Sequence, residues 1–248
     1  MQFEYKSAVI KITGLKKWFG ENHVLNGFDM ELFEGENLVI MGKSGSGKSV
    51  LIKCIVGLVE PDSGTIEVMG QDMSQLDEQK LDDLRTDVGF LFQGSALYDS
   101  MTVRENLEFP LRRHVKKFGK IDDTTPLVME ALESVGLAHA INLMPEELSG
   151  GMKRRVALAR TLILKPKIIL YDEPTTGLDP ITAKEIIALI QSVQAKYKTA
   201  SIIITHDTDC AKSIADRMIL LINGTNYVEG TFDKLFTSSD PEVAAFFK

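Results

Sequence analysis

The chain has 248 residues, of which 44% are hydrophobic and 25% charged, and its 28 Lys and Arg against 35 Asp and Glu give a net charge of −7. This much apolar sequence supplies the core of one large or two small domains, which excludes a fibrous or disordered chain. The acidic excess argues against nucleic-acid binding, which needs surplus cations to displace counterions from phosphates, so we expect no nucleic-acid partner.

The first part of the chain predicts strands followed by a glycine-rich loop. Residues 8–12, 15–19 and 23–32 are short strand-like runs separated by turn residues, and they predict an antiparallel β-layer. The apolar run at 37–41 ends in GKSGSGKS, after which residues 50–58 show a helical pattern. This segment therefore predicts a strand, a loop and a helix in succession.

The middle of the chain changes from mixed to mostly helical sequence. Residues 60–69 predict a further strand and residues 74–85 a helix. Residues 102–164 are mostly helical, and within them the apolar positions of 127–135 recur at spacings of three and four up to Gly136, which closes the helix. We interpret this stretch as a helical insert.

Two later runs, 168–171 and 201–205, are too apolar to alternate, as expected of parallel strands covered on both faces, and the amphipathic stretch 181–197 lies between them. The fold class is therefore α/β with a parallel sheet. The expected organisation is a single domain, 1–248, with a core of 1–93 and 161–248 and a helical subdomain of 94–160.

Two cysteines, Cys54 and Cys210, lie far apart and form no C-x-x-C pair. A disulfide framework and a zinc site are therefore excluded, and we expect two buried structural residues in a protein of the reducing cytoplasm. The N-terminal segment has no basic start followed by an apolar core, and no uncharged apolar run of about 18 residues occurs. We therefore expect neither a secretory signal nor a membrane span.

Residues 42–49 fit the pattern G-x-x-x-x-G-K-[ST] between a buried strand and a helix. Its glycines let successive backbone N–H groups converge on an anion, but a helix terminus contributes only about 0.3–2 kcal/mol, too little to hold a triphosphate. We therefore assign Lys48 to the β and γ phosphates, Ser49 to Mg²⁺, and the amides of residues 44–48 to the phosphate cradle.

Polar side chains follow the later strands at the sheet edge where α/β folds bind ligands. Asp172 comes directly after a buried strand and is expected to hold Mg²⁺ through a water, whereas Glu173 is expected to polarise the attacking water. His206 ends the next apolar strand, within expected reach of a γ-phosphate oxygen. Gln93, which follows the apolar GFLF, is a neutral candidate ligand for Mg²⁺.

A second glycine-rich segment, LSGGM at residues 148–152, opens a helix that carries Lys153, Arg154, Arg155 and Arg160. Ser149 is a suitable N-cap, and the glycines allow close approach of an anion. The chain's own phosphate loop does not need this segment, so it is expected to meet a nucleotide held by another subunit. The alternative is a well-capped structural helix.

Taken in order and spacing, GKSGSGKS, Gln93, LSGGM, LYDEP, Gly177-Leu178-Asp179 and His206 resemble the ATPase subunits of ABC transporters over essentially the whole chain. The resemblance implies a P-loop NTPase fold of ABC type. It also implies a head-to-tail homodimer that holds two ATP, each between one subunit's phosphate loop and the other's LSGGM. It further implies that residues after Gln93 dock a coupling helix of a membrane permease.

The resemblance also implies roles for single residues. Phe19 would stack on adenine, with Trp18 as the other candidate, Asp179 would act across the dimer, and His206 would contact the γ-phosphate. The expected catalytic set is Lys48, Glu173 and His206, and the metal set is Ser49, Gln93 and Asp172. The ATP-binding set is Phe19, Gly42, Lys43, Ser44, Gly45, Ser46, Gly47, Lys48, Ser49 and Val50, with Ser149, Gly150, Gly151 and Asp179 acting in trans.

Two residues depart from the family pattern: Met152 stands where glutamine is usual, and Lys43 where proline or a small residue is usual. The first departure, Met152, also occurs in a narrower group that the chain resembles. FLFQGSALYDSMTVRENLEFPL, MPEELSGGMKRRVALAR and SSDPEVAAFF look like the ATPase of Mla-type lipid transporters associated with MCE proteins. This narrower resemblance implies a phospholipid or another lipid as cargo, an MCE-domain partner in the periplasm, and a peripheral position on the cytoplasmic face of the inner membrane.

Two alternatives remain. One is the ATPase of a small-solute transporter, and the other is a soluble ABC switch that acts on a macromolecule. The second is disfavoured because the chain has one nucleotide domain, no long coiled-coil insert and no basic tail.

Overall fold

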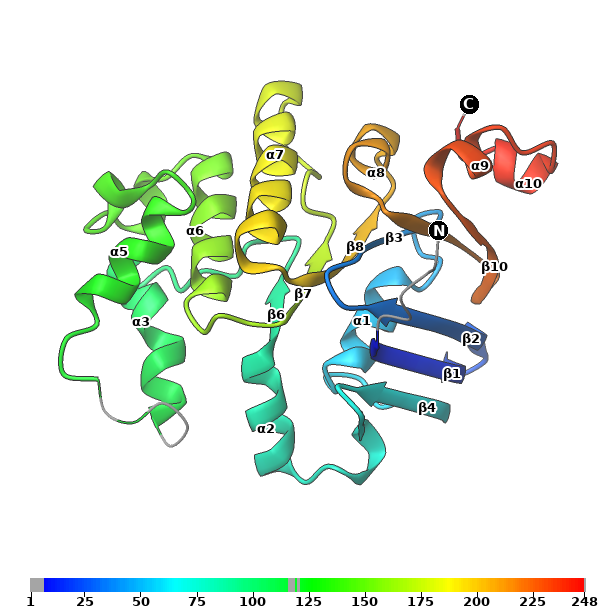
Figure 1. Cartoon of the computed structure of the whole chain (residues 1–248), viewed down its shortest axis with the longest axis horizontal. Coiled ribbons are helices and arrows are strands. Elements are labelled where there is room, and N and C mark those ends of the chain that lie inside the picture. Colours follow the sequence, from blue (N-terminus) through cyan, green and yellow to red (C-terminus); the bar gives the residue numbers. More distant parts are fainter. Residues whose placement is uncertain (1–6, 116–118, 120, 248) are drawn as a thin grey trace.

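The computed structural model describes residues 7–115, 119 and 121–247 (Figure 1). The expectation of no secretory signal falls partly on residues 1–6, which lie outside that range. Within the described residues, no helix has both the length and the apolar character that crossing a membrane requires.

The expected antiparallel layer at the N-terminal end is confirmed. Four strands form it in the order β2-β1-β4-β5, and neighbouring strands run antiparallel. β1 is one continuous strand rather than two, because it passes a bulge near Gly14 without losing its pairing to β2. The strands are β1 (Ala8–Phe19), β2 (Asn22–Phe33), β4 (Ser63–Val68) and β5 (Gln71–Asp72).

The second sheet has six strands in the order β10-β9-β3-β8-β7-β6. All neighbouring pairs are parallel except β9 with β10. Every residue of β3, β7 and β8 is buried, which is the reason their sequences do not alternate. The strands are β3 (Asn37–Met41), β6 (Val88–Leu91), β7 (Ile168–Asp172), β8 (Ala200–Thr205), β9 (Arg217–Ile222) and β10 (Thr225–Gly230).

Two apolar clusters cover the two faces of this sheet. Val39 belongs to one cluster, which continues into the helical insert at Leu132, whereas Ile40 belongs to the other, which extends to Phe28 of the antiparallel layer. Adjacent strand residues point to opposite faces, so one strand supports both layers. The predicted buried cysteines are confirmed, and burial raises the pKa of Cys54 to about 11 and that of Cys210 to about 12.

The helices lie mostly where the sequence predicts them, and those of the insert form the green lobe at the left of Figure 1. Helix α6 of this lobe packs on α3, α5, α7 and β6, so it joins the lobe to the sheet. The helices are α1 (Lys48–Ile55), α2 (Glu78–Asp87), α3 (Val103–Arg113), α5 (Thr125–Glu133), α6 (Gly150–Leu162), α7 (Pro180–Tyr197), α8 (Thr208–Ile214), α9 (Phe232–Phe236) and α10 (Pro241–Ala244).

Some boundaries differ from those expected. Helix α2 begins at Glu78 rather than at residue 74, because Asp77 caps it by accepting from the backbone N–H of Lys80, and a short 3-10 turn, Met73–Gln75, precedes it. The expected subdomain boundary at residue 160 falls inside α6. For the elements from β9 onward the sequence analysis makes no prediction, although β9 is an apolar run with four buried residues.

Candidate functional site

The phosphate-type loop, residues 42–49, leaves β3 and enters α1. Gly47 is the residue before the helix and has φ of 103°, and a Cβ there would lie 2.8 Å from Val24 Cγ1. A Cβ on Gly42 would lie 2.5 Å from Ser46 Oγ and 2.8 Å from the Leu221 carbonyl oxygen. Both positions require glycine because neighbouring atoms leave no room for a Cβ. Gly47 is also required because its backbone is in the left-handed conformation.

Lys48 lies under this loop with its side chain buried. Its Nζ donates to the carbonyl oxygens of Gly42 at 2.8 Å and Lys43 at 3.1 Å, and lies 3.8 Å from Glu173 Oε1. Burial lowers the pKa of the Lys48 ammonium, and the carboxylates of Glu173 and Asp172 offset part of that effect. A phosphate oxygen is a stronger acceptor than a backbone carbonyl oxygen, so a bound phosphate can replace the two carbonyl oxygens as the partner of the Lys48 ammonium.

Asp172 and Ser49 meet at the edge of the sheet, as the sequence predicts for the end of β7. Ser49 Oγ donates to Asp172 Oδ1 at 3.0 Å. Burial raises the pKa of the Asp172 carboxyl, and the bond from Ser49 opposes the rise. A buried carboxylate next to a hydroxyl is a set of hard oxygen donors that suits Mg²⁺.

Among the described residues, no group of three or more His, Cys, Asp or Glu is arranged to hold a metal ion. A cation beside Ser49 and Asp172 would therefore also need the Gln93 amide oxygen and oxygens of a substrate or water. Mg²⁺ suits such a site because it keeps several waters and is usually bound with substrate phosphates.

Glu173 follows Asp172 and has φ of 50°, a conformation that non-glycine residues rarely adopt. Its Oε2 accepts from Thr176 Oγ1 at 3.1 Å and from His206 Nδ1 at 2.9 Å. The Glu173 side chain is almost buried, whereas 63% of the His206 side chain is exposed. Backbone strain of this kind persists where surrounding contacts fix the residue, and such residues cluster at functional sites.

Most of these residues line one cavity of about 600 Å³, although Gly42, Ser46 and Asp172 are not part of its lining. It brings together side chains from three predicted groups: the aromatic residue Phe19, the loop, and the polar strand ends. Two of its residues, Val24 and Thr176, were missed by the sequence analysis, since Val24 belongs to a distant strand with no motif of its own. The lining residues are Phe19, Val24, Ser44, Gly45, Gly47, Lys48, Ser49, Val50, Gln93, Glu173, Thr176 and His206.

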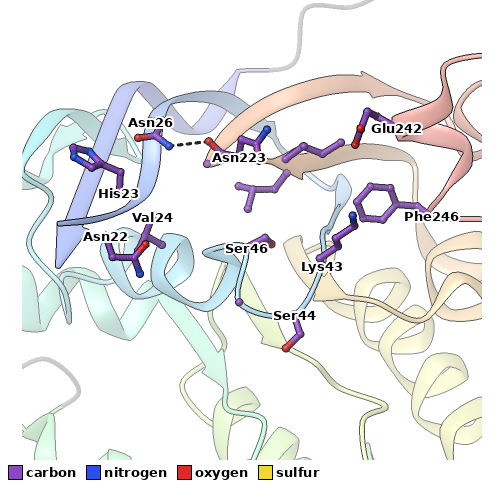
Figure 2. A pocket seen from close by; sticks show the side chains of 14 residues that line it. Asn22, His23, Val24, Asn26, Lys43, Ser44, Ser46, Asn223, Glu242 and Phe246 are labelled. Atoms are coloured by element: carbon purple, nitrogen blue, oxygen red, sulfur yellow. Dashed lines mark hydrogen bonds between the residues drawn. The ribbon is translucent and has the colours of Figure 1, made fainter. Parts of the chain in front are cut away.

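A second cavity of about 520 Å³ lies on the other side of the loop tip. Lys43 and Ser46 line it, and Figure 2 shows the Lys43 side chain extending toward Phe246 near the C-terminus. Its far wall includes Asn26, which donates to the Asn223 carbonyl oxygen at 2.8 Å. Lys43 thus contributes backbone to the first cavity's loop while its charged side chain faces the second.

The LSGGM segment does not line either cavity in the described part of the chain. Ser149 caps α6 by accepting from the Met152 N–H at 3.2 Å, which confirms the expected N-cap. Ser149 and Gly150 are exposed. The side chain of Met152 packs against the apolar cluster of the helical lobe, so the thioether replaces glutamine in a partly buried position.

Asp179 lies beside this segment and caps α7 by accepting from the N–H groups of Ile181 and Thr182, each at 3.0 Å. A Cβ on Gly151 would lie 2.6 Å from Thr182 Cγ2, so the starts of α6 and α7 touch at this glycine. Ile181 is 74% exposed next to Asp179. The two helix starts therefore present one exposed surface that is separate from the chain's own loop.

The chain has a buried strand that leads into a glycine-rich loop, and a buried lysine lies under that loop. The serine at the end of the loop is hydrogen-bonded to an aspartate from a nearby strand. This combination defines a P-loop nucleoside triphosphatase. Residues 25–176 match the family described as ABC transporter. The chain belongs to the ABC transporter family and is an ATPase of that family.

The chain is similar to several named transport proteins. It is 38% identical over 96% of its length to "Probable ribonucleotide transport ATP-binding protein mkl" of Mycobacterium leprae and 39% identical over 96% to "Methionine import ATP-binding protein MetN" of Campylobacter jejuni. It spans 68% and 75% of those proteins, respectively. Neither name refers to a lipid transporter.

Two solved structures resemble the chain closely. One is the ATP-binding cassette MJ0796 in a dimeric post-hydrolysis state bound to ADP and Pi, with a TM-score of 0.81 and 32% identity over 90% of this chain and 98% of that one. The other is cbiO1 of Clostridium perfringens, with a TM-score of 0.84 and 28% identity over 94% and 92%. The expected ABC-type fold is thereby confirmed.

Proposed function

We propose that the chain is the motor subunit of a bacterial ABC transporter, which hydrolyses ATP in the 600 Å³ cavity as one half of a head-to-tail homodimer. The observation that carries this proposal is the position of Glu173. Its carboxylate is almost buried, held by Thr176 and His206, and it faces the same cavity as Lys48. A base, a cation and a phosphate loop thus converge on one space.

ATP would lie along the cavity with its base and its phosphates at opposite ends. Phe19 is 52% exposed at the end of β1, with Lys17 Nζ 5.2 Å from the centre of its ring, and the ring supplies a stacking surface for adenine. The loop amides and the N-terminus of α1 would bind the phosphates. Lys48 would leave the carbonyl oxygens of Gly42 and Lys43 for the more negative phosphate oxygens.

Glu173 is the general base of this proposal. Its Oε2 already accepts two hydrogen bonds, and Oε1 lies 3.8 Å from Lys48 Nζ, so Oε1 would take a proton from the attacking water once Lys48 has turned to the phosphates. An ionised carboxylate and a phosphate oxygen both accept, so His206 would join them as the imidazolium, with Nδ1–H donating to Glu173 and Nε2–H donating to a γ-phosphate oxygen. His206 thus orients the base and contacts the reacting group at once.

Ser49, Asp172 and Gln93 are the residues that would hold Mg²⁺, Asp172 through a water. When bound, Mg²⁺ neutralises the developing phosphate charge and polarises the γ-phosphoryl group. Asp172 is suited to this position because its carboxylate is buried and accepts a hydrogen bond from Ser49, the other metal-binding side chain at this strand end.

The second half of each site would come from another copy of the chain. Ser149, Gly150 and Asp179 are exposed and Gly151 is half-buried, and none of the four lines the chain's own cavity. The free N–H groups at the start of α6 give the surface of these residues affinity for an anion. A head-to-tail dimer places it over the γ-phosphate of its partner, and the dimeric state of the similar cassette MJ0796 supports this arrangement.

The dimer would drive a membrane permease from the cytoplasmic side of the inner membrane. Residues after Gln93 lead directly from the cavity into the helical lobe, so they are the segment we assign to the permease coupling helix. Residues 94–160 would then move as a subdomain against 1–93 and 161–248, with α6 as the connecting helix.

Lipid is the first candidate cargo, on the strength of the Mla-type sequence stretches, and a periplasmic MCE-domain protein would be a partner. A small solute is the second candidate, because the relatives named above carry the terms ribonucleotide and methionine. Met152, packed against the lobe, is the structural feature that accompanies the lipid-type resemblance.

The test is to purify the permease complex and reconstitute it in liposomes. Phospholipid cargo predicts lipid bound to the complex and ATP-dependent lipid transfer to acceptor vesicles carrying the MCE partner. ATP-dependent uptake of methionine or a ribonucleotide, without lipid transfer, would assign the second cargo. ATP turnover that requires no permease and responds to a macromolecule would support the switch alternative.

A further inference from the structure

The segment around Gln93 is held on both sides by arginines of α6. On the N-terminal side, Arg154 Nη1 donates to the carbonyl oxygen of Phe92 at 2.9 Å. Its Nη2 reaches the carbonyl oxygen of Thr176 at 3.4 Å. Thr176 is the residue whose hydroxyl donates to Glu173. One guanidinium therefore spans the residue before Gln93 and the partner of Glu173.

On the C-terminal side, Arg160 binds two successive carbonyl oxygens. Its Nη1 donates to Ala96 at 2.8 Å and its Nη2 to Ser95 at 3.2 Å. Ser95 and Ala96 have φ of 63° and 47°, so two neighbouring non-glycine residues adopt the left-handed conformation. Such a pair is unfavourable on its own, and it persists only where the surroundings hold it.

Asn106 completes this support from α3. It is fully buried, accepts from the N–H of Tyr98 at 2.9 Å and donates to the carbonyl oxygens of Tyr98 at 3.1 Å and Met101 at 3.0 Å. The Arg160 guanidinium also lies 5.8 Å from the centre of the Tyr98 ring. The loop after Gln93 is thereby tied to two helices of the lobe.

The geometry of these contacts suits arginine and not lysine. A guanidinium is planar and can donate in two directions at once, whereas an ammonium is a single point of charge. Arg154 is 5% exposed and its Nε has no hydrogen-bond partner among the described residues, so the two carbonyl contacts, with the charge of Asp172, compensate its burial. Arg155, the next residue, instead pairs with Glu185 at the surface.

We infer that Arg154 and Arg160 are positioning residues, which fix Gln93 for Mg²⁺ binding and link it to Glu173. This inference rests on the proposed role of Gln93 as a metal ligand. Because both arginines belong to the helix that begins at Ser149, any shift of α6 moves Gln93 and Thr176 together. The partner-facing segment and the metal position of one subunit are therefore mechanically joined.

The experiment compares Arg154→Lys and Arg160→Lys with the matched control Arg155→Lys from the same helix. Binding of a fluorescent ATP analogue is titrated in EDTA and in Mg²⁺, and the ratio of the two affinities gives the contribution of Mg²⁺. We expect roughly a tenfold loss of that contribution in the two test variants, as for residues that orient metal ligands, with unchanged affinity in EDTA. Arg155→Lys should match the wild type.

Each variant is repeated in a Gln93→Ala background, where the arginine substitutions should cause no further loss because they act through Gln93. Losses that add to that of Gln93→Ala, or an unchanged Mg²⁺ contribution in both lysine variants, would overturn the inference while leaving the metal role of Gln93 intact. If Gln93→Ala alone has no effect on the Mg²⁺ contribution, the metal role fails and the inference with it. Should Arg154→Lys melt at a clearly lower temperature, Arg160→Lys decides the question.

Discussion

Glu173 and His206 are joined by a hydrogen bond of 2.9 Å between Oε2 and Nδ1, although the two residues are 33 positions apart in sequence. Each directly follows one of the adjacent strands β7 and β8. This bond fixes the carboxylate of one strand end against the imidazole of the next. Their roles in the proposed hydrolysis are therefore coupled, because removing either side chain also changes the position of the other.

Replacing Glu173 with glutamine should separate binding from chemistry. The amide keeps the size of the side chain but cannot take a proton, so ATP binding should persist while turnover falls by roughly 10²- to 10³-fold, the usual cost of one well-placed catalytic group. Phosphate release and nucleotide binding, measured on the same preparation, check this. Unaltered turnover in Glu173→Gln would remove Glu173 from the role of base.

Lys48→Ala should weaken the binding of ATP. A hydrogen bond to a charged group contributes about 1.5–3 kcal/mol, which corresponds to a loss of about 10- to 100-fold in affinity. Isothermal titration with ATP and Mg²⁺ measures the change. Lys53→Ala, on the same helix but outside the cavity lining, serves as the control and should bind ATP as the wild type does.

Asp172→Asn should stabilise the protein when no nucleotide is present. Burial raises the pKa of Asp172 in the folded state, so at pH values between the unfolded and the folded pKa the folded chain holds a proton on this group that the unfolded chain has lost. Folding stability from this group is therefore present below the unfolded value of about 3.9 and is lost as pH rises through the higher folded pKa.

At neutral pH the asparagine variant avoids the cost of burying a charge, so its melting temperature should exceed that of the wild type, and the difference should shrink as the solution is acidified into that window. Thermal melts across pH measure this. A lower melting temperature for Asp172→Asn at neutral pH would show that Lys48 and Ser49 more than compensate the buried charge.

Gly151→Ala should lower the melting temperature through a contact within the subunit. The new Cβ would lie 2.6 Å from Thr182 Cγ2, and a β-branched side chain has little freedom to move away. Gly150→Ala is the matched control, since its Cβ would meet only Leu178 Cδ2 at 3.9 Å.

Thr182→Ser removes Cγ2 but keeps the hydroxyl that donates to Asp179. Combined with Gly151→Ala, it should restore the melting temperature to that of Thr182→Ser alone. If the double variant stays as unstable as Gly151→Ala, the contact with Thr182 is not the reason for a glycine at this position.

The sequence predicts most of this site because the chemistry is concentrated in local motifs. The loop has glycine at position 47, where a Cβ would lie too close to Val24. The central strands are apolar throughout because both of their faces are covered. Both patterns can be recognised in the sequence without a structure. Val24 and Thr176 could not be found in this way. Their roles depend on strands and turns that are brought together only by the tertiary fold.

Lys43 is a case in which the motif includes the residue but does not predict the direction of its side chain. Its place in the motif predicts a charge beside the phosphates, yet its side chain lines the neighbouring cavity toward Phe246, more than 200 positions later in the chain. The arginines of α6 were likewise visible only as a cationic helix. Their bonds to the backbone on either side of Gln93 depend on how the lobe packs against β6.

The central claim is that two copies of the chain enclose each ATP, and the mass of the ATP-bound species tests it most directly. Sedimentation of Glu173→Gln with ATP and Mg²⁺ should give a dimer with two nucleotides. The same protein carrying Ser149→Arg should bind ATP and remain monomeric, because the added side chain obstructs the partner-facing surface; its stability should fall by no more than the loss of the α6 N-cap, about 0.5–2 kcal/mol. A monomer of Glu173→Gln that holds ATP fully shielded from solvent, or a dimer unaffected by Ser149→Arg, would contradict the account.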